Sequence, residues 1–222
     1  MKHETFNSII AFLGLGLAAI TAWHQFAPKS DAITLVSEGR VEVGRPLEID
    51  PIGTIDHITG ANQPVAGPIT WKLRIHNPTD HAVSLVSFET YLLTEANRRI
   101  KYSTMRERLS PFQVELPVQH LPENIPPNES RAYLVSLFVP FSSDEDAQDQ
   151  CEQAAESLRS LERCFFEKGR DMFGNRVQIV ESGSELFAAQ WTDEFEGPRF
   201  LVVLETADGS EFSTNLSFLP GL

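Results

Sequence analysis

The run PITWKLRIHN, residues 68–77, alternates apolar and polar residues from its second position to its ninth. Such a period of two places successive side chains on opposite faces of a β-strand, one face buried and the other wet. The apolar face holds Ile69, Trp71, Leu73 and Ile75. Pro78 follows at its favoured position in a tight turn. This stretch therefore predicts a strand that covers a hydrophobic core and then turns back.

Further runs are rich in β-branched and aromatic residues and are bounded by turn residues. The predicted strands lie at 33–37, 41–49, 82–93 (the returning strand), 98–104, 111–117, 131–140 and 176–182, and in the run 199–219, which Asp208-Gly209 divides as a hairpin. Helices do not alternate with strands, so a parallel α/β sheet is disfavoured. We predict a mainly β body over residues 30–222, an antiparallel immunoglobulin-like β-sandwich, which in architecture alone resembles the immunoglobulin-like domains of exported bacterial proteins.

One stretch, residues 142–162, predicts a helical insertion in this body. Ser142 and Glu145 match a capping box, and apolar residues recur on one helical stripe through Leu161. We expect the helix to pack across one end or edge of the sandwich. Phe165 and Phe166, a turn around Gly174-Asn175 and the strand after it then predict a second hairpin.

The two cysteines of the chain, Cys151 and Cys164, bracket the end of that predicted helix. On one continuous helix their Cα atoms would lie about 20 Å apart, far beyond the roughly 7 Å that a disulfide allows. If the helix ends near Ser160 and the chain turns back, four extended residues cover about 13 Å, which matches the rise of the helix from Cys151. We therefore predict a structural disulfide, permitted by an oxidising compartment.

The N-terminal segment predicts a membrane anchor over residues 1–29. Residues 9–23 carry no charge, and 6–26 would form a helix of about 31 Å, the thickness of a hydrocarbon core. Small residues share one face of that helix at a spacing of four and suit close packing between transmembrane helices. They are Gly14, Ala18 and Ala22. The alternative is a signal peptide cleaved near Ala22, which would release a soluble secreted protein.

The short tail before the anchor and the large body after it favour an orientation with the N-terminus in the cytoplasm. We predict a single-pass protein of the bacterial inner membrane with a periplasmic body. The whole chain carries a formal charge of −13, and because residues 1–29 contribute +1 through Lys2, Lys29 and Glu4, residues 30–222 carry −14. Such a body repels phosphates, so no nucleic-acid partner is expected.

Two surfaces are candidates for binding. The residues 53–67 predict a long loop with Asp56, His57 and Asn62 between glycines, and long loops at a sandwich end often carry binding, although a plain solvent loop fits as well. The second candidate is a basic cluster, which would meet an acidic partner or balance nearby acids. It comprises Arg98, Arg99, Lys101, Arg106 and Arg108.

The sequence contains none of the catalytic, metal-binding or phosphate-binding motifs for which it was searched. The six histidines lack zinc-ligand spacing, and nucleophile-elbow and phosphate-loop patterns are missing from the sequence. We predict no catalytic activity, metal or cofactor. The leading functional prediction is a non-enzymatic interaction or structural module with protein partners, part of or accessory to an envelope assembly. A glycan- or peptidoglycan-binding module that uses the 53–67 loop is the alternative.

Overall fold

The computed structural model describes residues 16–17, 30–42, 46–55, 62–94, 96–102, 108–111, 121–141, 150–151, 156–182 and 187–218. The chain forms two compact units, Met1–Asp31 and Ala32–Leu222. Of the predicted anchor only Gly16 and Leu17 are described, and both are helical. The predicted packing face of the anchor lies outside the described residues. Within the described ranges, no helix is long and apolar enough to cross a membrane.

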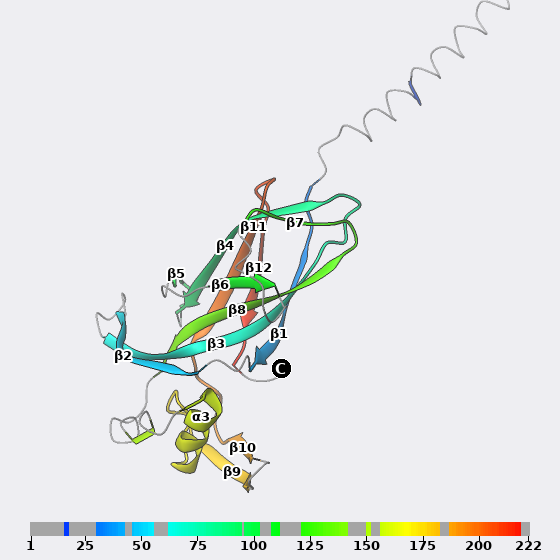
Figure 1. Cartoon of the computed structure of the whole chain (residues 1–222). Helices are drawn as coiled ribbons and strands as arrows, with labels where there is room; N and C mark the ends of the chain where they lie inside the picture. The colour runs from blue at the N-terminus through cyan, green and yellow to red at the C-terminus, as the bar shows by residue number, and fades with distance from the viewer. Residues whose placement is uncertain are drawn as a thin grey trace, which may run out of the picture. The chain divides into compact units, whose positions relative to one another are not determined.

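The unit Ala32–Leu222 is mainly β, and its described strand pairs are antiparallel, as predicted (Figure 1). The first five-stranded sheet has the order β1 (Thr34–Val41), β3 (Asn62–His76), β8 (Ser130–Pro140), β6 (Arg108–Pro111), with β2 (Glu48–Ile55) also paired to β3. The second has the order β12 (Glu211–Leu216), β11 (Arg199–Thr206), β4 (Val83–Leu93), β5 (Arg99–Lys101), with β7 (Glu123–Ile125) also paired to β4.

A smaller group of elements lies at one end of the two large sheets (Figure 1). It contains the helix α3 (Leu158–Glu167) and a two-stranded ribbon of β9 (Val177–Ser182) and β10 (Phe187–Trp191). We call the described residues between Gln150 and Gly197 the lobe.

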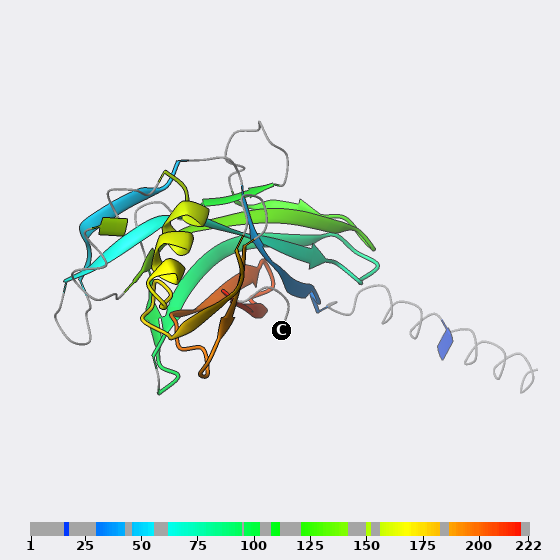
Figure 2. The same cartoon turned by 90° about the horizontal axis from the view of Figure 1, so that it is seen from below.

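The two large sheets share one hydrophobic core. The four apolar residues predicted for the inner face of β3 are all buried, with Trp71 at 0 % exposure. Ile69, Trp71 and Leu73 pack with Phe200 and Val202 of β11 and with Leu216 of β12, whereas Ile75 packs in a second cluster with Leu204 of β11. The core thus joins β3 and β8 in one layer to β11 and β12 in the other (Figure 2). The predicted hairpin at Asp208-Gly209 is confirmed as the β11–β12 turn.

The predicted return from β3 into the strand at 82–93 is wrong in its pairing. β4 is a strand, but it belongs to the second sheet and pairs with β11, not with β3. Asn77, fully buried, explains the crossing: its side-chain amide donates to the carbonyls of His81 and Ile125 at 2.8 and 3.0 Å. Its backbone N–H donates to Glu129. The turn thus links the two sheets instead of closing a hairpin.

The predicted long loop at 53–67 is wrong in its bounds, and its central residues 56–61 lie outside the described residues. β2 continues to residue 55 and β3 begins at residue 62, and the two strands pair with each other. Gly53, Pro64 and Gly67 of this stretch lie inside strands. Gly67 sits where β3 shifts register against β8, and a Cβ there would stand 2.9 Å from the Leu137 carbonyl oxygen. The residue is glycine because the backbones approach so closely, not because a loop passes there.

The predicted helix at 142–162 has different bounds. α3 begins at Leu158 and continues to Glu167, while residues 142–149 and 152–155 lie outside the described part. Ser157 has extended backbone angles, and its hydroxyl accepts the Ser160 N–H at 3.1 Å while the Ser160 hydroxyl accepts the Ser157 N–H at 2.9 Å. This reciprocal cap starts a new helix at a point where one continuous helix was predicted.

The predicted second hairpin is confirmed only at its turn. Phe165 and Phe166 belong to α3, not to a strand. An isolated bridge joins Arg170 to Arg176 across the turn, and the strand that follows pairs with β10. Other strand bounds move by a few residues: β1 extends to Val41, and the strand predicted at 41–49 starts at Glu48. Residues 112–117 of a further predicted strand are not described.

Candidate functional site

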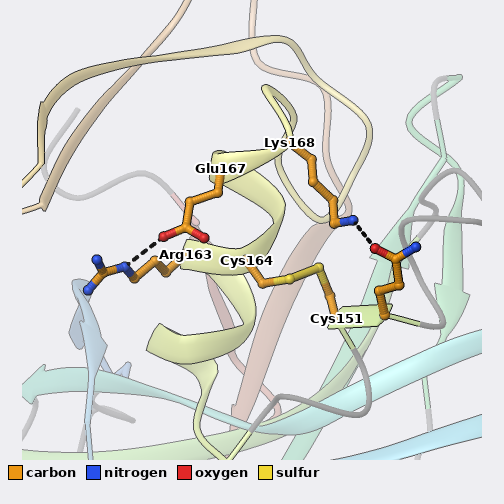
Figure 3. The surroundings of a disulfide bond; sticks show 6 residues. Cys151, Arg163, Cys164, Glu167 and Lys168 are labelled. Carbon is orange, nitrogen blue, oxygen red and sulfur yellow. Dashed lines mark hydrogen bonds and ion pairs between the residues drawn. A yellow bond between two sulfur atoms is a disulfide. The ribbon is translucent and has the colours of Figure 1, made fainter.

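The lobe is held together by the predicted disulfide, which is confirmed. Cys151 and Cys164 are bonded, with Cα atoms 5.6 Å apart (Figure 3). The predicted route to this bond is wrong: the helix does not end near Ser160, and Cys164 lies inside α3. The two cysteines can meet because α3 starts after Cys151. Lys168 also holds this segment, since its Nζ donates to the Gln150 side chain at 2.7 Å.

The buried face of α3 attaches the lobe to the large sheets. Leu161 and Phe165, spaced four residues apart, are 0 % and 1 % exposed. They pack with Cys151, Met172 and, from the large sheets, Ala66 and Phe141. On the exposed side of the helix, Arg163 and Glu167 form an ion pair at 3.0 Å (Figure 3). The lobe therefore has its own apolar cluster, closed on one side by the disulfide.

Asp171 organises the turn between α3 and β9, a role that the sequence pattern did not reveal. Its side chain is buried, and one carboxylate oxygen accepts the backbone N–H groups of Phe173 and Asn175 at 2.8 and 2.9 Å. The other oxygen accepts the Asn175 side chain at 2.7 Å and the Trp191 indole at 2.9 Å. The carboxylate thus ties the turn to β10. The signal available in the sequence was an aspartate placed before a Gly-Asn turn.

Arg40 joins the lobe to β1 through a bulge that was not predicted. The register of β1 on β3 shifts between Ser37 and Arg40, where Gly39 has a φ of +99°. The shift sets Arg40 opposite Trp71, on the inner face, although strict alternation would place it outside. Its guanidinium lies 2.5 Å from the Glu162 carboxylate.

Arg40 also lines a small aromatic pocket between the lobe and the sheets. Its guanidinium lies 5.7 Å from the ring centre of Phe218. The other aromatic residues of the pocket contact one another edge to face; they are Phe166, Phe173, Trp191 and Phe195. The rings and the ion pair form a packed seam between the lobe and β1.

Among the lobe side chains whose burial is described, the most exposed large apolar one lies on β9. The pairing shifts between Ala188 and Ala189, so Val180 is an extra residue with no partner on β10. A bulge of this kind turns a side chain out of the regular alternation. Val180 is 65 % exposed. Among the described residues, β9 and β10 pair with no third strand, so the ribbon offers backbone edges beside an apolar side chain.

The predicted basic cluster is divided between the two large sheets. Arg99 and Lys101 lie on β5, Arg108 lies on β6 of the other sheet, and Arg106 is outside the described residues. Lys101 lies 2.5 Å from the Glu89 carboxylate, and this hydrogen bond holds the pKa of Glu89 below its usual value. Lys101 thus balances a nearby acid.

Arg199, which was not in the predicted cluster, joins its β5 end. It donates from Nη2 to the Thr94 carbonyl at 3.0 Å and to the Asn97 side chain at 3.1 Å. Arg98 and Arg99 follow directly in the chain after this turn, and all three arginines are exposed. Strand pairing, which sequence spacing does not show, brings Arg199 beside them.

The other predicted residues do not assemble into a site that the structure describes. Asn62 opens β3 opposite Ile55, and Asp56 and His57 lie outside the described residues. Over the ranges described, no group of three or more His, Cys, Asp or Glu side chains could hold a metal ion. No protein-family model matches the chain, and no curated protein matches it.

Proposed function

We propose that the chain is a membrane-anchored, exported contact module: an immunoglobulin-like sandwich that carries a disulfide-stapled lobe and binds a protein partner. Two five-stranded antiparallel sheets around a buried tryptophan support the sandwich. The charge-free segment at residues 9–23 supports the anchor. The module would belong to, or assist, an assembly of the bacterial envelope.

The observation that carries this proposal is the disulfide between Cys151 and Cys164. Disulfides persist in the periplasm and outside the cell and are rare in the cytosol. This bond fixes the segment at Cys151 to α3 and so stiffens the lobe that we assign to contact. Stiffening a surface before it binds lowers the entropy lost on binding.

Within the lobe, the ribbon around Val180 is the surface that fits a protein partner. An exposed apolar residue at a bulge, beside backbone edges that pair with no third strand in the described ranges, suits addition of a partner strand or contact with an apolar pocket. The glycan alternative has less support, because strands occupy both ends of the loop that it would use.

Site-specific photocrosslinking in cells tests this function. A photoreactive residue replaces Val180 in the full-length chain, and a matched one replaces Val36, which is 46 % exposed on β1. We expect discrete crosslinked bands from position 180 and none of the same mass from position 36. Equal patterns from both positions, or no protein adduct at position 180, would contradict the assignment of contact to the lobe.

A further inference from the structure

On the outward face of the second large sheet, basic and acidic residues lie at opposite ends of β11. Phe200, Val202 and Leu204 of β11 point into the core, so the alternate residues of that strand face outward. These outward residues are Arg199, Leu201, Val203 and Glu205. Arg199 and Glu205 are six residues apart, which is about 20 Å along a strand.

One end of this face is basic. Arg199 and Arg99 both pair with Leu93, one from each side, so they lie in one row across three strands. Two strand spacings separate their Cα atoms by about 10 Å. Among the described residues, no carboxylate lies within ion-pair distance of either arginine. Arg199 is held over the β4–β5 turn through Nη2 alone, which leaves its other donors available.

The other end of the same face is acidic. Glu205 of β11 lies directly opposite Glu211 of β12, an arrangement in which like charges destabilise a sheet. Neither carboxylate has an ion-pair partner in the described part of the chain. The two ends therefore carry opposite charges that find no ion-pair partner among the described residues.

The middle of the face is filled by its own side chains. Leu201 and Val203 are 8 % and 7 % exposed, and Tyr91 lies beside Leu201 in the register. Lys101 and Glu89, which lie in this region, form an ion pair with each other. A partner surface that lies flat on this face would meet Tyr91 and the Lys101–Glu89 pair in the centre and the charges of both ends.

We propose that this face packs against the same face of a second copy of the chain, with the two β11 strands antiparallel. A two-fold axis between Leu201 and Val203 makes the contact isologous and places Arg199 of each copy over Glu205 and Glu211 of the other. Aligned sheets cross at about 30°, which displaces strand ends about 10 Å from the axis by about 5 Å, within reach of an arginine side chain.

The charge pattern also selects between the two possible orientations. With the strands parallel, the basic ends would meet each other and the acidic ends would meet each other, which like-charge repulsion opposes. Only in the antiparallel orientation does the basic end of each copy meet the acidic end of the other. The surface involves neither the disulfide nor Val180, so this dimer goes beyond the proposed function. If the protein proved not to form this dimer, the crosslinking result at Val180 would be unaffected.

A charge swap in the full-length chain, purified in a density-matched detergent, tests the dimer by sedimentation equilibrium. We expect Arg199→Glu and Glu205→Arg each to raise the dimer dissociation constant at least about tenfold, because each reversal acts twice across the axis. The double variant should regain the dimer, since the two exchanged charges are again opposite in sign where they meet across the axis. Arg176→Glu, the same change on an exposed arginine of the lobe, should leave the dimer unchanged.

A proximity measurement separates this contact from any association of the N-terminal helices. Ser213→Cys places an exposed thiol next to Val203, near the axis. A short bis-maleimide should join two copies through it, and the added Arg199→Glu change should abolish the crosslink. A monomeric wild type, a double variant that stays monomeric, or a crosslink that survives Arg199→Glu would overturn the proposal.

Discussion

Replacement of Trp71 with alanine is expected to lower the free energy of unfolding by about 3–5 kcal/mol, the range for deleting a large buried aromatic side chain. Trp71 is fully buried, and its ring packs edge to face against Phe218 with centroids 5.1 Å apart. Its indole N–H donates to the Ser217 carbonyl at 2.9 Å. The substitution therefore opens a cavity between the two large sheets and removes the indole hydrogen bond to the Ser217 carbonyl.

Urea denaturation followed by far-ultraviolet circular dichroism measures the loss. Trp71→Phe keeps an aromatic ring and removes the indole donor, so its loss should be clearly smaller. Val36→Ala, which removes methyl groups from a side chain that is 46 % exposed, serves as the surface control. If Trp71→Ala costs no more than the surface control, the two sheets do not share the core described above.

The double change Cys151→Ala and Cys164→Ala is expected to cost about 3 kcal/mol, because the bond closes a short loop and its loss restores entropy to the unfolded chain. The two cysteines are separated by 13 residues in the sequence. Because Cys151 packs with Leu161 and Phe165, alanine also leaves a small gap in the lobe.

Reductant provides the matched control for this prediction. Wild-type protein in reductant should lose about the same stability as the double alanine variant, measured by the same urea titration. The variant itself should not respond to reductant. A reductant effect of equal size on both proteins would show that it acts elsewhere than on this bond.

The local features of the fold were predictable because they depend on neighbouring residues. The alternation at 68–77 predicts the buried face of β3, and Asp208-Gly209 predicts the β11–β12 turn. The disulfide was also predicted, although by a wrong route, since the helix was expected to end near Ser160 and α3 instead includes Cys164. In the first two cases the decisive residues lie within a few positions of one another.

Long-range pairing was not predictable from these patterns. The turn after Asn77 looks like a hairpin, and only the buried contacts of its side chain show that the chain crosses to the other sheet. For the same reason Arg199 was missed: it lies about a hundred residues from Arg98 and meets that arginine's turn only through β4. Strand order decides such neighbours, and alternation carries no information about strand order.

The helix boundary shows a different limit. Ser157 and Ser160 form the cap, but serine at the third helical position is a weaker signal than the glutamate that follows Ser142. The bulge at Gly39 is similar, since a single glycine in a strand pattern does not reveal which way the next side chain turns. Because of both features, residues of the candidate site lie in places other than those predicted.

Thiol labelling of the full-length chain in cells tests the central claim most directly, because an exported contact module requires the disulfide to form where the protein works. Cells are quenched in acid, the protein is denatured, and a maleimide reagent is added with or without prior reduction. We expect Cys151 and Cys164 to react only after reduction. Equal labelling without reductant would contradict both the bond and the oxidising compartment that it implies.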